Sequence, residues 1–215
     1  MMNLFPPAHD LVLFITAAAV LLLMPGPAVL YIVARSVDRG RMAGLASSSG
    51  IAVGTLVHVL AATLGLSALL LSSAAAYSLV RYAGAAYLFY LGIKKFHERP
   101  RNENGKHMPP VPMRTMFAQG ILVNVLNPKT AIFFFAFLPQ FVIPARGHVT
   151  LQFFALGMMF ALMGWASDSV WALSAGSAGG LLRDNRKFIE NERYAAGTVY
   201  MGLGLVTALS GSRHK

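Results

Sequence analysis

Cysteine is absent from this chain of 215 residues. The absence excludes disulfide bonds, thiol nucleophiles, cysteine-ligated metals and thiol-disulfide electron transfer. Charge is also scarce, because only 12% of the residues are charged and a soluble domain carries about twice that fraction. Hydrophobic residues make up 56% of the chain. The composition therefore predicts an integral membrane protein, which leaves transport, or catalysis by groups other than thiols.

The net charge of +10 is unevenly distributed along the chain. Thirteen of the 18 Lys and Arg residues fall in three short segments, residues 35–41, 94–114 and 183–193, separated by long apolar stretches. This pattern is typical of short cytoplasmic loops in membrane proteins. A nucleic-acid-binding protein would instead need its basic residues on one folded surface. We therefore predict the lipid bilayer as a partner and no nucleic acid.

The apolar stretches predict an all-α polytopic membrane protein with six transmembrane helices. Residues 11–34 contain no Asp, Glu, Lys or Arg and would extend about 36 Å as a helix, enough to cross a bilayer core. Residues 43–80 also lack these charges but are too long for one crossing, so they hold a second helix and a turn near residues 71–75. The remaining helices are expected at residues 77–93, 115–142, 148–182 and 194–209, the fifth ending in a surface turn around residues 176–180.

Residues 96–114 are predicted to form a cytoplasmic linker, because several prolines lie there among charged residues. The single membrane domain, residues 1–215, then divides into residues 1–95 and residues 115–215. The first ten residues contain no Lys or Arg, so the first helix lacks the basic region of a cleaved signal peptide. Cytoplasmic basic segments make the first, third and fifth helices run inward and place both termini outside.

Weak internal similarity indicates that a unit of three helices is used twice. Arg-Tyr-Ala occurs at residues 81–83 and again at 193–195, and Leu-Gly recurs ten residues later in both copies. The Pro-Gly-Pro of residues 25–27 corresponds to the Asn-Pro-Lys of residues 127–129. Because three is odd, the second copy enters the membrane from the opposite side. An inverted 3+3 repeat is typical of secondary transporters.

Prolines predict a break in the first helix and a matching break in the fourth. Each proline removes a backbone N–H and leaves a carbonyl without its helical partner, and such breaks are tolerated in lipid only beside protein or a wet cavity. Paired breaks at matching positions point to a substrate site, although two packing kinks remain the structural alternative. The residues predicted at this site are Pro25, Gly26, Pro27, Asn124, Asn127, Pro128 and Lys129.

Three titratable residues fall inside the predicted spans. Lys129 would cost about 2.5 to 3.5 kcal/mol to insert, so it is expected to bind a substrate carboxylate or to pair with Asp168. Asp168 is the only acidic residue inside the predicted spans, and it could receive an amino group or carry a coupling proton. His58 is the second candidate for proton coupling, although its position alone favours a hydrogen-bonded core histidine. Gly50 and Gly54 indicate close helix packing and leave a homo-oligomer open.

Several motifs together resemble the LysE and RhtB family of amino-acid exporters over nearly the whole chain. They are Met-Pro-Gly-Pro at residues 24–27, Gly-Ile-Ala-Val-Gly at residues 50–54 with His58, Asn-Pro-Lys at residues 127–129 and Phe-Leu-Pro-Gln-Phe at residues 137–141. The resemblance implies a multi-pass exporter in a bacterial inner membrane. It also implies as substrates amino acids or derivatives such as homoserine, threonine, lysine or homoserine lactones, and coupling to the proton-motive force.

Two departures from the family pattern bear on the substrate. Met24 and Ala28 flank the Pro-Gly-Pro motif where many members have Thr and Asn, and Thr55 stands where some have an acidic residue. With Asp168 as the one acid at depth, a dibasic substrate would find few partners. We therefore predict export of neutral amino acids or close derivatives.

Other classes fit the residues less well. An intramembrane hydrolase built on Ser49 and His58 lacks both helical-face spacing and a Gly-x-Ser-x-Gly elbow, so we predict that the chain is not an enzyme. A metal-ion exporter of related architecture is the main alternative. A metal-ion exporter would need several converging carboxylates or histidines, and only Asp168 and His58 are available inside the predicted spans. No cofactor or resident metal is expected.

Overall fold

The computed structural model describes residues 5–66 and 112–177, together with isolated positions between 79 and 205. Apart from these isolated positions, the predicted third and sixth helices, the turn at residues 71–75 and nearly all of the linker lie outside the described residues. In the two long described segments every regular element is helical. These elements are α1 (Ala8–Leu23), α2 (Pro27–Arg39), α3 (Arg41–Ala61), η1 (Ala62–Leu66), α6 (Met113–Val125), α7 (Pro128–Ile132), η2 (Phe133–Phe137), η3 (Leu138–Phe141), η4 (Pro144–Arg146) and α8 (Val149–Ser177).

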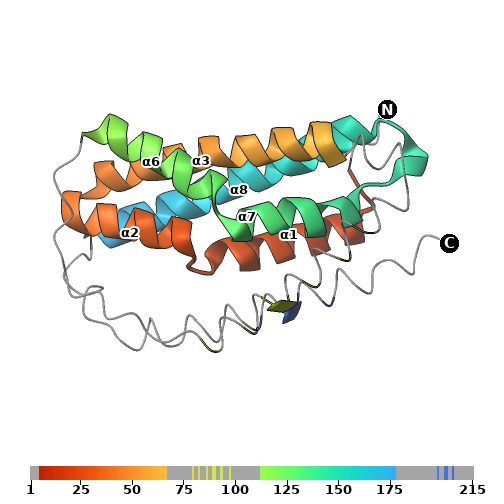
Figure 1. Ribbon diagram of the computed structural model, residues 1–215, viewed down its shortest axis with the longest axis horizontal. Helices are drawn as coiled ribbons and strands as arrows, with labels where there is room; N and C mark the ends of the chain where they lie inside the picture. The colour runs from red at the N-terminus through yellow and green to blue at the C-terminus, as the bar shows by residue number, and fades with distance from the viewer. Residues whose placement is uncertain are drawn as a thin grey trace.

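The described helices lie lengthwise beside one another in an elongated bundle (Figure 1). Two of them are long and apolar enough to cross a membrane: α3 with η1, 26 residues, and α8, 29 residues. Two bent helix pairs bring the number of candidate spans in the described segments to as many as four. At 1.5 Å per residue, 26 residues extend about 39 Å, which exceeds a hydrocarbon core of about 30 Å. The predicted class of all-helical membrane protein is confirmed.

Both predicted helix breaks are present. The axes of α1 and α2 are bent by 48°, and those of α6 and the helix that begins with α7 by 47°. Pro27 and Pro128 each occupy the first turn of the second half-helix, where a missing N–H is tolerated. Gly26 caps α2 in an extended conformation, whereas the Asn127 side chain caps α7 by accepting the Lys129 N–H at 3.1 Å.

The predicted end of the first span is wrong, because α2 continues past residue 34 to Arg39. The charge at Arg35 does not end the helix, since its side chain is buried and its Nη2 donates a 2.9 Å hydrogen bond to Oε1 of Gln119 on α6. A partner from another helix therefore keeps this arginine inside the bundle. The sequence pattern gives only the position of the charge, not its partner.

Small residues set the distance between α3 and α6. A Cβ at Gly50 would collide with the carbonyl of Phe117, and one at Gly54 would lie 2.7 Å from the carbonyl oxygen of Ile121. From the opposite helix, a Cβ at Gly120 would lie 2.6 Å from the carbonyl oxygen of Ser47. Gly50 and Gly54 thus serve packing within one chain, as the close-packing prediction requires.

The fifth predicted span corresponds to α8, which begins within one residue of the expected start. The surface turn expected from Gly176 is wrong at that residue, because Gly176 is still helical and a Cβ there would lie 2.8 Å from the backbone N of Arg41. The end of α8 is therefore packed on the start of α3. Residues 178–180 lie outside the described residues.

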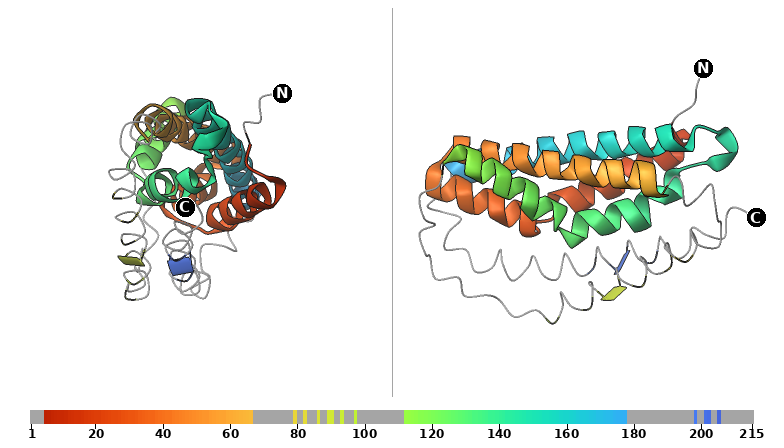
Figure 2. Two further views of the ribbon diagram at one scale, coloured as in Figure 1. Left: turned by 90° about the vertical axis from the view of Figure 1, so that its right-hand side faces the viewer. Right: turned by 45° about the horizontal axis from the view of Figure 1, so that its top comes forward.

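The two bent spans run in opposite directions. In Figure 1, α1 and α2 run from right to left, whereas α6 and α7 run from left to right; α3 and α8 are likewise antiparallel. The end-on view of Figure 2 shows these helices packed around a common axis. The junction of α2 with α3 and the start of α6 both lie at the left-hand end of Figure 1. Arg39, Arg41 and Arg114 belong to these helix ends.

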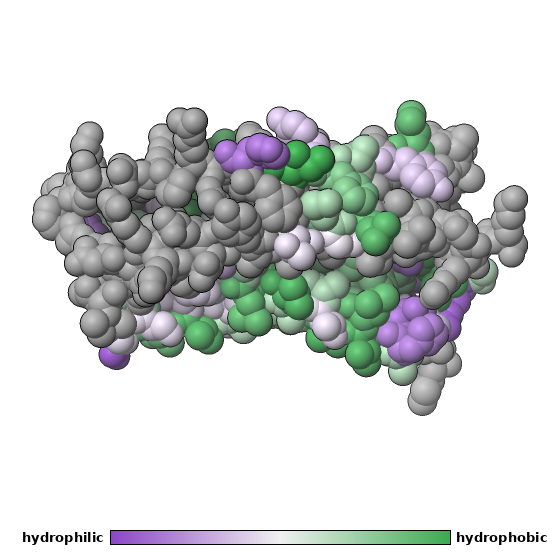
Figure 3. Space-filling view, turned by 90° about the horizontal axis from the view of Figure 1, so that it is seen from below, coloured by the Kyte–Doolittle hydropathy of each residue, from purple (hydrophilic) through white to green (hydrophobic). Residues whose placement is uncertain are grey.

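The outer surface carries large apolar side chains at mid-length, including Leu23, Leu126, Leu162 and Val170. Apolar residues also gather along the lower middle of the face in Figure 3. Inside, an aromatic cluster formed by Phe14, Phe133, Phe137 and Phe160 joins α1, η2 and α8, with the rings of Phe133 and Phe160 stacked at 4.1 Å between centroids. An apolar exterior around an apolar core is the arrangement that a bilayer requires.

Candidate functional site

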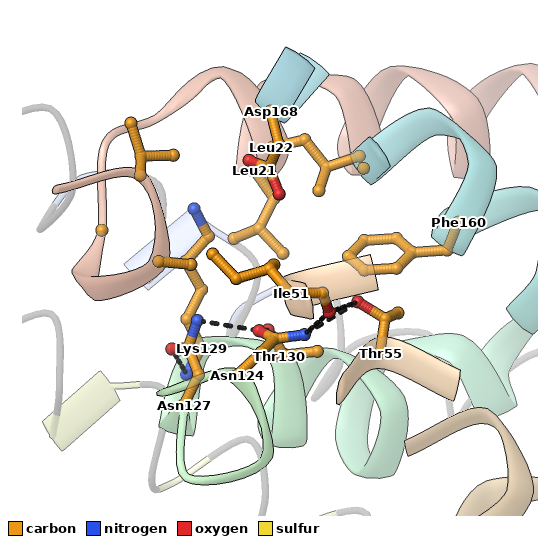
Figure 4. Close-up of a pocket in the computed structure, with 14 residues that line it drawn as sticks. Leu21, Leu22, Ile51, Thr55, Asn124, Asn127, Lys129, Thr130, Phe160 and Asp168 are labelled. Carbon is orange, nitrogen blue, oxygen red and sulfur yellow. Dashed lines mark hydrogen bonds between the residues drawn. The ribbon is translucent and has the colours of Figure 1, made fainter. Parts of the chain in front are cut away.

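A small cavity lies where the two helix breaks meet (Figure 4). It has about 30 Å³ of room for the centres of water molecules, enough for about two waters. An amino acid is larger than this, so the described conformation is closed around the site. The lining residues are Leu21, Leu22, Gly26, Ala28, Val29, Ile51, Thr55, Asn124, Asn127, Lys129, Thr130, Phe160, Gly164 and Asp168.

Most of the predicted site residues come together at this cavity. Gly26, Asn124, Asn127, Lys129 and Asp168 line it. The three prolines Pro25, Pro27 and Pro128 are not in the lining; they shape the backbone that presents their neighbours. His58 is also outside the lining, one contact away through Asn124.

Lys129 joins the two breaks directly. Its Nζ donates a 2.7 Å hydrogen bond to the carbonyl oxygen of Met24, which lies in the break between α1 and α2. The side chain is only 7% exposed, and it runs past Gly26, where a Cβ would lie 3.3 Å from Lys129 Cδ. Glycine at position 26 therefore leaves room for the lysine. A backbone carbonyl freed by the first break is satisfied by a cation from the second.

The side-chain amide of Asn124 organises one wall of the cavity. Its Nδ2 donates to the Ile51 carbonyl at 2.9 Å and to Thr55 Oγ1 at 2.8 Å. Its Oδ1 accepts from Thr130 Oγ1 at 2.9 Å and from Asn127 Nδ2 at 3.3 Å. Both donor hydrogens and both acceptor lone pairs are used, so the amide orientation is fixed.

Thr55 and Thr130 were not predicted as site residues. The sequence signal was weak, because threonine is common in apolar helices as a back-bonding residue, and Thr55 does donate to the Ile51 carbonyl one turn before it at 3.1 Å. The approach of α6 to α3 brings the Thr55 hydroxyl to Asn124, whereas the break between α6 and α7 brings the Thr130 hydroxyl to it. The spacing that could have suggested them is Thr55 directly after Gly54 and Thr130 three residues after Asn127.

His58 takes the carbonyl that Pro128 leaves without its helical N–H. The His58 Nε2 lies 3.0 Å from the Asn124 carbonyl oxygen, which also accepts the N–H of Asn127 at 3.0 Å. Because the acceptor is a carbonyl, Nε2 carries the hydrogen in this arrangement. The imidazole stacks on Phe134 with 5.9 Å between ring centroids. This geometry fits a hydrogen-bonded core histidine, which is one of the two roles that the sequence suggests for His58. A role for His58 in proton coupling stays a prediction.

Asp168 reaches the cavity from α8, and Lys129 reaches it from α7 (Figure 4). Its side chain is 6% exposed. Among the described residues, ion pairs within 4.0 Å join His9 to Asp10 and Arg39 to Asp38, and Asp168 is not paired with Lys129 in this conformation. The direct ion pair considered from the sequence is therefore not formed.

The arrangement brings a cation and an acid from two different helices to one cavity. Lys129 stands at the N-terminal end of a half-helix, where the backbone dipole also favours an anion. Leu21, Val29 and Phe160 supply apolar surface to the same lining. In the described part of the chain no three His, Asp or Glu residues converge as metal ligands. The chemistry suits a small zwitterion with an apolar side chain.

Comparison with known proteins agrees with this chemistry. The model of the LysE type translocator family matches residues 19–211. The chain belongs to this family. Membership points to a transporter in a membrane rather than an enzyme, and it confirms the resemblance based on the Pro-Gly-Pro and Asn-Pro-Lys motifs.

Relatives cover nearly the whole chain. The uncharacterised membrane protein YrhP of Bacillus subtilis is 30% identical over 94% of this chain and all of its own length. An uncharacterised membrane protein of Vibrio cholerae is 26% identical over 93% of this chain and 97% of its own. The leucine efflux protein of Salmonella typhimurium is 25% identical over 88% of this chain and 90% of its own. No solved structure matches the chain significantly.

Proposed function

We propose that this protein exports neutral amino acids from the bacterial cytoplasm across the inner membrane. The observation that carries the proposal is that Lys129 and Asp168 reach one cavity from two different helices. The substrate carboxylate binds Lys129 and the start of α7, and the substrate ammonium binds Asp168. The efflux of leucine, named for the Salmonella relative, fits the apolar lining of this cavity.

Charge balance narrows the substrate class. A dibasic amino acid brings a second cation, and Asp168 is the one acidic side chain among the described residues that line the cavity. Homoserine lactone lacks the free carboxylate that Lys129 would bind. Neutral amino acids, including leucine and homoserine- or threonine-like molecules, match both partners.

The transport cycle follows from the two breaks. In the proposed inverted repeat, each half contributes one bent span, and the halves rock about the Lys129 to Met24 contact. Support comes from the opposite directions of the bent spans and from the 105-residue separation that this hydrogen bond bridges. Substrate carboxylate displaces the Met24 carbonyl from Lys129, which loosens the join between the halves and lets the cavity open.

Proton coupling is assigned in this proposal to Asp168. A carboxylate that faces the cavity can exchange a proton with one side of the membrane. It can bind the ammonium of a substrate that arrives from the other side. Because the two events compete for one group, proton entry drives substrate release. The basic residues at the α2 and α6 end support a cytoplasmic location for that end, where the substrate enters in this proposal.

Reconstituted liposomes test the proposal. Purified protein is placed in liposomes loaded with labelled leucine, threonine, lysine or leucinamide, and release is followed with and without an imposed pH gradient. We expect leucine or threonine to leave fastest and the gradient to accelerate release. Leucinamide, which lacks the carboxylate, should stay inside. Failure to release any amino acid, or equal release of leucinamide, would overturn the proposal.

A further inference from the structure

Arg35 forms a second buried cationic group, away from the cavity. Its side chain is 5% exposed, its Nη2 donates to Gln119 Oε1 at 2.9 Å, and its guanidinium lies over the Tyr31 ring, 5.5 Å from the centroid. The Tyr31 hydroxyl lies 2.9 Å from the Met116 carbonyl oxygen and 3.2 Å from the same Gln119 oxygen. These contacts connect α2 to α6, in the half of the bundle that holds α2 and not α1.

The hydrogen-bonding capacity of Arg35 is only partly used. Within the described structure, Nε and Nη1 are buried and have no hydrogen-bond partner. The acid nearest to it on α2, Asp38, pairs with Arg39 at 3.5 Å. A buried guanidinium with unpaired N–H groups is costly, and it is uncommon where no ligand is meant to bind. Arginine is also the side chain best suited to bind a carboxylate.

Arg35 lies about two helical turns along α2 from the cavity. Ala28, Ile32 and Arg35 follow one another on one face of α2, and Ala28 lines the cavity. The seven residues from Ala28 to Arg35 span about 10 Å along the helix axis. Between them, fully buried Ile32 packs with Ile51 and Ala172 into an apolar layer. Arg35 therefore lies beyond a closed apolar layer, toward the end that carries Arg39 and Arg41.

We propose that Arg35 is an outer subsite that binds the carboxylate of the amino acid before the apolar layer opens to the cavity. The inference rests on the proposed function, because it takes an amino acid as the ligand. The carboxylate occupies Nε and Nη1, and it competes with Gln119 for the guanidinium. Loss of the Gln119 contact loosens α2 from α6, which lets the Ile32 layer part. The amino acid then passes inward, and its carboxylate moves from the Arg35 side chain to the Lys129 side chain.

Nuclear magnetic resonance of the intact protein in lipid nanodiscs tests this subsite. Arginine labelled with ¹⁵N gives an Nε–H signal for Arg35, assigned by its disappearance in Arg35→Lys. Leucine, then threonine and lysine, is titrated in, with leucinamide as the probe that lacks a carboxylate. We expect an amino acid to shift the Arg35 signal and leucinamide to leave it unmoved. Arg114, which is exposed at the same end, is the internal control.

Lys129→Met separates a local effect from one transmitted from the cavity. Binding at Arg35 predicts that the shift persists in this variant, because the outer subsite does not need the inner lysine. Loss of the shift in Lys129→Met, or no shift with any of the three amino acids, overturns the subsite. The failure is distinguishable from that of the proposed function, since wild-type liposomes would still release an amino acid if only the subsite were wrong.

Discussion

The Lys129 ammonium donates a 2.7 Å hydrogen bond to the Met24 carbonyl oxygen, across 105 residues of chain. The bond connects the two helix breaks, because Met24 ends α1 and Lys129 lies in the first turn of α7. A cation held by a neutral carbonyl can exchange that partner for a carboxylate, which binds it more strongly. In the proposed function, this contact holds the site closed until a substrate carboxylate replaces the Met24 carbonyl.

Replacing Lys129 should abolish transport without harming insertion. Lys129→Met removes the carboxylate partner, and removing a charge at mid-span eases insertion. We expect loss of at least about a hundredfold in leucine or threonine release, which corresponds to about 2.7 kcal/mol. Release from liposomes and elution as a single species measure the two effects. Arg146→Ala is the matched control, because that exposed arginine bonds only the Phe5 carbonyl among described partners. Normal transport by Lys129→Met would exclude the lysine as a ligand.

Asp168→Asn should separate gradient-driven transport from exchange. The amide keeps the shape of the acid and mimics its protonated form, so it cannot cycle a proton. We expect loss of acceleration by a pH gradient, with exchange of unlabelled for labelled substrate retained. Because no direct ion pair joins Asp168 to Lys129 in this conformation, folded yield should stay normal. Asp10→Asn, at the start of α1, should behave as wild type. Full gradient-driven transport in Asp168→Asn would leave His58 as the next candidate.

A methyl group at position 26 should disturb the lysine more than the fold. The Gly26 backbone has φ −130° and ψ −170°, which alanine adopts freely, whereas the added Cβ would lie 3.3 Å from Lys129 Cδ. We expect Gly26→Ala to slow transport by about tenfold, or about 1.4 kcal/mol, and to leave the melting temperature nearly unchanged. Gly65→Ala is the control, because a Cβ there meets nothing within 4 Å among the described atoms. Equal transport by Gly26→Ala and Gly65→Ala would contradict the idea that glycine at position 26 is needed to leave room for the Lys129 side chain.

Substituting His58 should cost stability. His58→Leu removes the Nε2 hydrogen bond to the Asn124 carbonyl, and the loss of one buried hydrogen bond costs about 1 to 3 kcal/mol. His58→Gln can restore a donor and should recover part of the loss. Thermal unfolding in detergent measures the effect, and the pH profile of transport by His58→Gln tests coupling. A pH profile of transport that matches wild type would mean that His58 only stabilises the helix break. A flat pH profile would assign His58 to proton transfer.

Single cysteines test the orientation, because the native chain contains none and gives no background. Arg114→Cys lies at the start of α6, and Ala145→Cys lies in η4 at the opposite end of the bundle. With the basic end in the cytoplasm, an impermeant thiol reagent added to intact cells should label Ala145→Cys and spare Arg114→Cys. Both should react after the cells are opened. The reverse pattern in intact cells would invert the proposed topology.

The sequence by itself determined the features that depend on local chemistry. Hydrophobic runs specify spans because lipid excludes unpaired charge, and Pro27 and Pro128 specify breaks because a missing N–H acts within one helical turn. Lys129 and Asp168 stood out for the same reason, since a charge inside an apolar run is costly wherever its helix is placed.

The tertiary structure alone decided which partners these residues meet. His58 reaches the Asn124 carbonyl across 66 residues, and Arg35 reaches Gln119 across 84. No local pattern encodes these pairs. The first exists only once Gly50, Gly54 and Gly120 let α3 and α6 approach to backbone contact, and the same approach turns Thr55 toward Asn124. The second depends on the packing of α2 against α6, which keeps Arg35 inside a helix that the charge pattern would have ended. Packing distance, which the one-dimensional pattern does not contain, is the physical quantity that made the difference.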